Sequence, residues 1–295
     1  MHKSFDFSTQ SLEQLAQSDV ARALAEDVGN GDLTAGLIAP TRQAHARVLA
    51  RESAVVCGQA WVQAAFLALD PQAEITWYVM DGGRCEANQV VFEVQGNAQA
   101  LLTAERTALN FLQLLSGVAT KTASYVVQVA GTRAAIVDTR KTLPGLRLAQ
   151  KYAVRCGGGT NHRVGLYDAV LIKENHIAAA GGIPQVLQQA EKIAGQAAFI
   201  EIEVETLEQL AQALDAGARM VLLDNMSLPT LHEAVSINAA KGAERAILEI
   251  SGGVTLAGLR ELAETGVDRI SIGTLTKDVQ ATDYSMRFDS FAGAQ

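Results

Sequence analysis

The sequence predicts an α/β protein: an incomplete (β/α) barrel of about six to seven parallel strands plus a mixed α+β N-terminal domain. Short apolar runs alternate with helix-like stretches from residue 134 onward. This is the pattern of a parallel sheet with right-handed crossovers, and repeated units of this kind curl readily into a barrel. The first third of the chain lacks this rhythm, so we assign it to a separate domain.

The N-terminal domain is placed at residues 1–116. Apolar residues recur at helical spacing over 10–26, before a turn-rich loop that offers a helix start at Asp32. The next expected elements are a strand at 46–57, a helix at 59–69, strands at 75–80 and 90–94 joined around 81–83, and a helix from Thr103 toward Val129. Period-two alternation around Met286 predicts a C-terminal strand, within 279–295, that returns to this domain.

The barrel domain is placed at residues 117–278. Its expected strands are short and apolar, and they lie at 134–137, 169–172, 199–204, 220–223, 246–250 and 269–272. Helix-like stretches at 207–216, 228–239 and 256–264 fill gaps between them, and glycines lie near their ends, as is common after helices.

Composition excludes several classes of protein. The 295-residue chain has a formal net charge of −8, which does not favour binding to nucleic acids or anionic membranes. Its three cysteines form no C-x-x-C pair, so neither a disulfide framework nor a zinc site is indicated. The N-terminus has no secretory pattern and the apolar runs are too short to cross a membrane. We therefore expect a cytoplasmic protein with reduced thiols.

Polar residues cluster where the six expected strands end. They are Asp138 to Lys141, Lys173 to His176, Glu201 with Glu203 and Glu205, Asp224 to Ser227, Glu249 with Ser251 to Gly253, and Ser271 with Gly273 and Thr274. One charged strand end is unremarkable, because strands must reach water. Six in succession, with both signs of charge, predict an active site at the mouth of the barrel.

The segment from Asp138 to His176 reverses the sign of the whole chain. It contains seven Arg or Lys residues and three acids, although the chain has 24 basic and 32 acidic residues. Such a local reversal indicates a ligand with several negative groups. Lys151 and Arg155 are four residues apart on an expected helix and could equally form a solvated face.

Glycine-rich turns suggest where anionic groups bind. Backbone N–H groups in the turns at 251–253 and 271–274, after the last two strands, are suited to a monophosphate, although plain βα turns would look similar. The loop at 157–163 could approach an anion or could simply end a helix. Glu203 and Asp224, on adjacent strands, suit Mg²⁺ or ribose hydroxyls, and an ion pair with a lysine is the alternative for either.

These motifs together resemble quinolinate phosphoribosyltransferase (nicotinate-nucleotide pyrophosphorylase, carboxylating). The most specific match runs from Asp138 to Arg147 and continues to His176. Further matches lie at 26–34, 103–106 with Asn110, 201–204, 223–225 and 251–253, so the resemblance covers nearly the whole chain.

The resemblance implies a two-domain subunit that forms a homodimer or a dimer-based hexamer. It implies transfer of phosphoribosyl from phosphoribosyl pyrophosphate to quinolinate, giving nicotinate mononucleotide, pyrophosphate and CO₂ in NAD biosynthesis, with Mg²⁺ as cofactor.

Site roles follow from the resemblance by position. Those expected to be catalytic are Lys141, Lys173, Glu203 and Asp224, the last two also near Mg²⁺. Arg140, His162, Arg163 and Lys173 match the quinolinate pocket, Lys141 matches a pyrophosphate contact, and Arg106 matches an arginine that reaches the partner subunit's site. The other expected substrate contacts are Thr139, Ser251, Gly252, Gly253, Ile272, Gly273 and Thr274.

Three other functions fit parts of the pattern. A Schiff-base aldolase would use Lys173 or Lys141 as its nucleophile, but it leaves the many arginines unexplained. A related pyrophosphorylase-like barrel would take another acceptor, such as nicotinate. A catalytically silent phosphate-binding or assembly protein is disfavoured by the intact polar strand ends.

Overall fold

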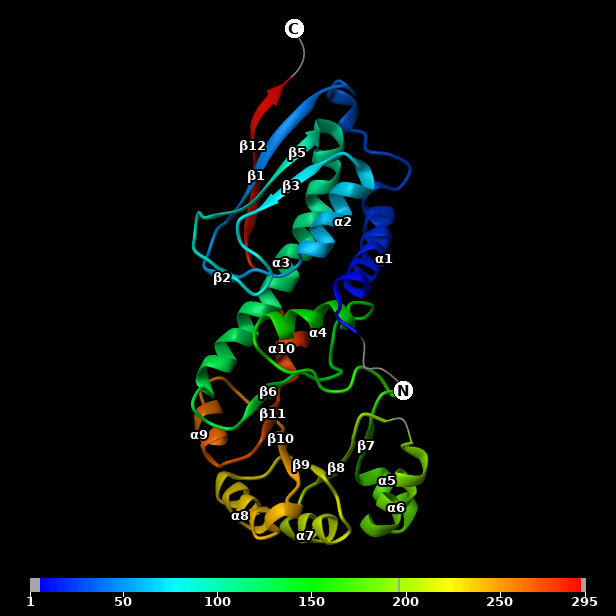
Figure 1. Ribbon diagram of the computed structural model, residues 1–295, viewed down its shortest axis with the longest axis vertical. Helices are drawn as coiled ribbons and strands as arrows, with labels where there is room; N and C mark the ends of the chain where they lie inside the picture. The colour runs from blue at the N-terminus through cyan, green and yellow to red at the C-terminus, as the bar shows by residue number, and fades with distance from the viewer. Residues whose placement is uncertain (1–5, 196, 293–295) are drawn as a thin grey trace. The chain divides into compact units, whose positions relative to one another are not determined.

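The computed structural model describes residues 6–195 and 197–292, without the side chains of 290–292, and it divides into two compact units (Figure 1). We call one the antiparallel unit; its described residues are 6–123, 143–158 and 276–292. The other is the parallel unit, and its described residues are 124–142, 159–195 and 197–275. The chain therefore leaves the parallel unit after Thr142 and returns to it at Gly159. The domain limits drawn from the sequence stay a prediction.

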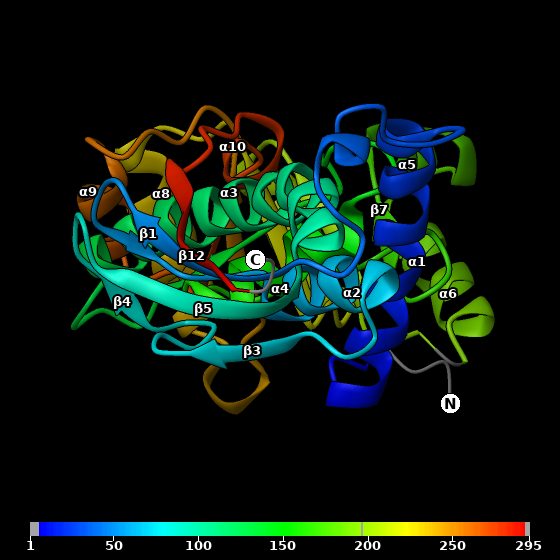
Figure 2. The same cartoon turned by 90° about the horizontal axis from the view of Figure 1, so that it is seen from above.

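The antiparallel unit is built on a four-stranded sheet in the order β12-β1-β5-β3 (Figure 2). Its strands are β1 (Gln43–Ala50), β3 (Glu74–Trp77), β5 (Val90–Asn97) and β12 (Tyr284–Ala292), and β2 (Ala54–Val55) pairs with β4 (Arg84–Cys85). Its helices are α1 (Thr9–Val28), the short η1 (Ala35–Leu37), α2 (Gln59–Leu69) and α4 (Arg147–Cys156), together with most of α3 (Ala98–Gln128).

The parallel unit contains a six-stranded sheet in the order β6-β11-β10-β9-β8-β7, and every pairing in it is parallel. The strands are β6 (Ala135–Val137), β7 (Val170–Ile172), β8 (Ile200–Val204), β9 (Met220–Asp224), β10 (Ile247–Ser251) and β11 (Arg269–Ser271). The helices are α5 (Glu174–Ala180), α6 (Ile183–Ile193), α7 (Leu207–Asp215), α8 (Leu228–Ala239), η2 (Gly242–Glu244) and α9 (Leu259–Glu264), and α10 (Thr274–Lys277) begins at its boundary.

The order of the strands indicates an incomplete barrel. Consecutive strands from β7 to β11 are neighbours, and β11 pairs with β6, the first strand of the series. Strands β6 and β7 stand at the two sheet edges, and a single parallel bridge from Val137 to Thr160 begins to fill the opening between them. The predicted fold class, an α/β protein with a mixed N-terminal part, is therefore confirmed.

Most elements lie where the sequence places them, and three differ. The expected strand at 46–57 is two strands, because Ser53 and its neighbours break the ladder between β1 and β2. The long helix begins at Ala98 rather than Thr103, directly after β5. The expected helix start at Asp32 is only a capped turn, in which the carboxylate accepts the N–H groups of Thr34 and Ala35 before η1.

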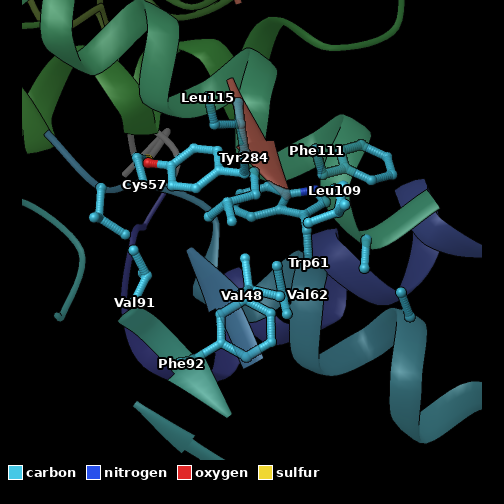
Figure 3. Packing of buried hydrophobic residues seen from close by; sticks show 14 of the residues in the cluster. Val48, Cys57, Trp61, Val62, Val91, Phe92, Leu109, Phe111, Leu115 and Tyr284 are labelled. Carbon is cyan, nitrogen blue, oxygen red and sulfur yellow. The ribbon is translucent and has the colours of Figure 1, made fainter. Parts of the chain in front are cut away.

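The core of the antiparallel unit centres on Trp61 from α2. Its fully buried ring lies among Leu109, Phe111 and Leu115 of α3, with Val48 of the sheet nearby (Figure 3). Its indole N–H donates to the buried Asp19 carboxylate at 2.9 Å, so the polar edge is also satisfied. A separate apolar cluster fills the parallel unit. In the described part of the chain, no helix is both long and apolar enough to cross a membrane.

Gly157 allows α4 to pack closely against α3. A Cβ atom at this position would lie 2.4 Å from the Ala119 carbonyl oxygen and 2.6 Å from the Thr122 Cβ. Neither neighbour can rotate away, because one is backbone and the other is branched on a buried helix face. The glycine after α4 is thus required by packing, whatever else the following loop does.

We expect Gly157→Ala to lower the free energy of unfolding by about 1–3 kcal/mol, the usual cost of overpacking. Urea unfolding curves measure it. Gly36→Ala is the control, since nothing lies within 4 Å of a Cβ there. Equal midpoints for the two variants would contradict the packing argument.

Candidate active site

All six strands of the parallel unit point the same way, so their carboxyl ends share one edge of the sheet. Neighbouring strands are in register there: Ser251 pairs with Asp224, and Val204 pairs with Leu223. The polar residues that follow the strands in sequence are therefore gathered at one mouth. An active site at this edge, with the roles expected of its residues, stays a prediction.

Asp138, at the end of β6, draws the glycine-rich loop to this mouth. The carboxylate is fully buried and accepts the His162 backbone N–H at 2.8 Å and the Asn161 side-chain amide at 2.7 Å. The bridge between Val137 and Thr160 continues this pairing. A buried carboxylate that accepts such hydrogen bonds is a structural anchor, and it sets the position of Arg163.

Arg140 and Arg163 bring two positive charges together. Burial lowers the pKa of Arg163, and the nearby charge of Arg140 lowers it further. The Nε atom of Arg140 is buried and has no hydrogen-bond partner among the described residues. Two neighbouring like charges and a buried donor without a partner among the described residues are both unfavourable. An anion accepting from both guanidinium groups would remove both costs.

His162 uses both ring nitrogens inside the protein. Nδ1 accepts the backbone N–H of Arg163 at 2.8 Å, so the other nitrogen, Nε2, carries the proton and donates to Glu201 at 2.8 Å. The residue is buried, with 8% of its surface exposed. The imidazole therefore holds the backbone of Arg163 in place rather than offering a ring nitrogen to the mouth.

Two acids lie beneath this layer of basic residues. Glu201 and Glu249 are completely buried, and burial raises the pKa of each to about 7. Arg269 lies 2.8 Å from Glu249 and also lowers the pKa of both acids. These three residues could not be recognised as one group from the sequence. Glu201 and Glu249 are only two of several strand-end acids there, and Arg269 lies at the start of an expected strand.

Lys173 and Glu203 form an ion pair across neighbouring strand ends. The lysine Nζ donates to the glutamate at 2.9 Å, as the sequence alternative allowed. Lys173 is exposed and also caps α5, where its backbone N–H donates to His176. Asp224 is partly buried at the end of the next strand, β9. Two carboxylates from adjacent strands are the hard oxygen donors that suit Mg²⁺.

The turns after β10 and β11, which the sequence predicts to bind phosphate, contain Gly252, Gly253 and Gly273, and the space is open at Gly253. Gly252 and Gly253 both have positive φ angles, of 97° and 54°, and nothing lies within 4 Å of a Cβ at Gly253. A Cβ at Gly273 would lie 2.9 Å from the Lys141 side chain, which places this lysine beside the second turn. The Thr274 hydroxyl there is buried and has no partner among the described residues.

Other candidate residues lie in the antiparallel unit. Arg106 is exposed on α3. The alternative that Lys151 and Arg155 form a solvated face is wrong, because Lys151 is fully buried. Arg155 is exposed and lies over the Phe7 ring, 5.2 Å from its centroid.

An α/β barrel unit with an arginine pair, glycine turns and paired carboxylates at its strand ends defines an enzyme class that acts on anionic, phosphorylated substrates. The family is shown by comparison. Residues 118–287 match the C-terminal domain of quinolinate phosphoribosyl transferase, and residues 32–116 match the N-terminal domain of the same enzyme. The chain belongs to the quinolinate phosphoribosyl transferase family.

Individual relatives are similar to this chain along most of their length. The nicotinate-nucleotide pyrophosphorylase (carboxylating) of Mycobacterium leprae is 41% identical, covering 92% of this chain and 96% of that protein. A mitochondrial quinolinate phosphoribosyltransferase (decarboxylating) of Nicotiana tabacum is 39% identical over 91% of this chain and 80% of its own length. The solved structure of the nicotinate-nucleotide pyrophosphorylase from Francisella tularensis has a TM-score of 0.91 and 42% identity, covering 98% of this chain and 100% of that one.

We expect the stability of the chain to fall between about pH 4.5 and 7 because of the buried acids. An unfolded glutamate titrates near 4.5, whereas Glu249 keeps its proton to about 7 in the folded chain. The folded state then binds more protons in this window, so rising pH favours unfolding. Glu249→Gln should gain stability relative to the parent by on the order of 1–3 kcal/mol between pH 5 and pH 8.

Urea unfolding at several pH values measures this difference. Glu244→Gln, at an exposed position, is the matched control. Parallel pH profiles for the parent and Glu249→Gln would show that the carboxyl group is not protonated in the folded state.

Proposed function

We propose that this chain transfers the phosphoribosyl group of phosphoribosyl pyrophosphate to quinolinate, with loss of CO₂, in the de novo synthesis of NAD. Its family membership supports this reaction. The observation that carries the substrate assignment is the buried, unpartnered Nε of Arg140 beside the charge of Arg163. This pair needs an anion that can accept from two planar donors.

Quinolinate fits the arginine pair because it carries two adjacent carboxylates on a planar ring. Arginine binds carboxylates through two parallel N–H groups, whereas lysine acts as a point charge. In our proposal Arg140 and Arg163 hold the carboxylates, and His162 contributes by fixing Arg163 through its backbone. Lys173 supplies a further positive charge from the next strand end.

The phosphoribosyl pyrophosphate lies, in our proposal, along the opposite side of the mouth. Its 5′-phosphate accepts from backbone N–H groups of the turns at Ser251 to Gly253 and Ile272 to Thr274, and from the Thr274 hydroxyl. Lys141, beside Gly273, contacts the pyrophosphate, with Thr139 at the same strand end. The Thr139 hydroxyl accepts the Lys141 backbone N–H at 3.1 Å, which helps to set the direction of this segment.

Glu203 and Asp224 face the ribose in this arrangement. Transfer from C1 of ribose has a transition state with positive charge on the sugar, which nearby carboxylates stabilise. Magnesium held with the substrate near these two acids would neutralise charge on the leaving pyrophosphate. The pyridine nitrogen of quinolinate is itself the nucleophile, so the protein needs none. Positioning and electrostatics are its main contributions.

Decarboxylation then leaves a carbanion beside the cationic ring nitrogen, and the substrate acts as its own electron sink. Lys173 is better placed than His162 to manage charge at this step. His162 is buried with both ring nitrogens engaged within the protein, whereas Lys173, although paired with Glu203, is exposed at the strand ends.

A Schiff-base aldolase is less well supported. Its nucleophile would have to be a neutral amine. Lys173 instead donates to the Glu203 carboxylate at 2.9 Å, so its side-chain nitrogen is held in an ion pair.

The purified chain, supplied with phosphoribosyl pyrophosphate and Mg²⁺, should release CO₂ and nicotinate mononucleotide from quinolinate and should not use nicotinate. Arg140→Ala should raise the KM for quinolinate by about 10–100-fold, the usual loss for charged hydrogen bonds. Radiolabelled CO₂ release measures the reaction of quinolinate, and chromatography of the mononucleotide product measures the use of either acceptor. Arg219→Ala is the control, because Arg219 precedes the amino end of β9 and the candidate site lies at the carboxyl end. If nicotinate reacts at a rate comparable with quinolinate, the assignment of quinolinate as the acceptor is wrong. If quinolinate releases no CO₂, the proposal is refuted.

We also propose that the chain forms at least a dimer in which Arg106 of one subunit completes the site of the other. Arg106→Ala and Lys141→Ala should each be inactive alone. Mixed after gentle dissociation, they should recover part of the activity, because some hybrid dimers contain one site with neither change. Chromatography of the mixture confirms assembly, and hybrids without any activity would exclude a shared site.

A further inference from the structure

The antiparallel unit contains a pair of thiols that the proposed reaction does not use. Cys57 lies just before Gly58, the residue that precedes α2, and Cys156 is the last residue of α4. The two sulfur atoms and a carboxylate oxygen of Asp81 all lie within 4.8 Å of one another. Residues far apart in the sequence are thus brought into contact by the fold.

The backbone on both sides of the pair is firmly held. The Cys57 N–H donates to the Ser116 hydroxyl at 3.0 Å, and that hydroxyl donates back to the Cys57 carbonyl at 3.3 Å. Figure 3 shows Cys57 near Tyr284, at the edge of the apolar cluster. On the other side, the close approach of Gly157 to α3 fixes the end of α4. Little backbone motion is therefore available to separate the sulfurs.

The two thiols differ in their access to water. Cys57 is completely buried, and burial raises its pKa well above the ordinary value, whereas Cys156 is only partly buried. Asp81 lies beside both, where its carboxylate accepts the Gly58 and Gln59 N–H groups and the Tyr152 hydroxyl. An outside reagent would therefore meet Cys156 first, and Cys57 could react only with its neighbour.

We propose that Cys57 and Cys156 form a reversible intramolecular disulfide when the protein meets a peroxide. Cys156 attacks the peroxide, the O–O bond breaks, and the products are Cys156 sulfenic acid and an alcohol or water. Cys57 then attacks that sulfur, the S–O bond breaks, and water leaves as the S–S bond forms. Asp81 is the carboxylate placed to take the Cys57 proton on its way to this water.

The position of the disulfide connects it with the candidate active site through the chain itself. Residues 143–158 form one excursion between two loops of the site. Arg140 and Lys141 precede this excursion, and Asn161 to Arg163 follow it. A bond at Cys156 fastens the end of the excursion to the start of α2. The inference concerns thiol chemistry, so it stands or falls independently of the acceptor used in the proposed reaction.

The test treats the folded, reduced chain with stoichiometric hydrogen peroxide and measures intact mass and peptide maps. The parent should lose the mass of two hydrogen atoms, give a cross-linked peptide joining Cys57 to Cys156, and return to its original mass with dithiothreitol. Cys85, the third thiol, should remain open to alkylation after unfolding. Cys85→Ser is the matched control and should form the same cross-link.

Substituting one cysteine at a time separates the role of Cys156, which reacts with peroxide, from that of Cys57, which forms the disulfide. Cys57→Ser should accumulate a sulfenic acid at Cys156 that dimedone traps, because the resolving thiol is missing. Cys156→Ser should leave Cys57 unmodified. The proposal is overturned if the parent is oxidised at Cys156 to sulfinic acid while Cys57 remains a thiol, or if the cross-links join different molecules.

Discussion

The parallel register of six short strands is the constraint on which the candidate active site depends. Each strand contributes only a few residues to the mouth, and none of these groups lies beside another in the sequence. Pairing such as that of Ser251 with Asp224 brings them to a common edge. Side chains alternate across a strand, so a slip of one residue would turn Glu203 and Asp224 away from the mouth. Apolar packing on the opposite face, to which Ile202, Leu223 and Ile250 belong, opposes that slip.

Charge is arranged in layers around this edge. Glu201 and Glu249 are buried, His162 links them to the loop at 157–163, and Arg140 lies near Arg163. Acids in a dry interior cost free energy, as the raised pKa values of both glutamates indicate. They lie next to Arg269 and the imidazole, which offset part of that cost. In the proposed reaction, the neighbouring guanidinium groups of Arg140 and Arg163 are the positive charges that meet the anionic substrate.

Much of the fold could be predicted from short-range pattern. Helix α2 lies at 59–69 as expected, and each of the six parallel strands lies within one or two residues of its expected position. Apolar runs and helical periodicity are local signals, so they can be recognised without knowing which residues pack against them. The break between β1 and β2 was missed, because both pieces are apolar and only their different pairing partners separate them.

The candidate site was predictable as a set of residues rather than as an arrangement. The sequence by itself determined the barrel class, the basic segment after β6, the glycine turns and the family, since each is written in consecutive residues. Only the tertiary structure decided that His162 is directed inward to Glu201, that Lys151 is buried while Arg155 is not, and that Cys57 meets Cys156. These outcomes depend on which distant groups compete for the same donor or the same space, and packing alone fixes that competition.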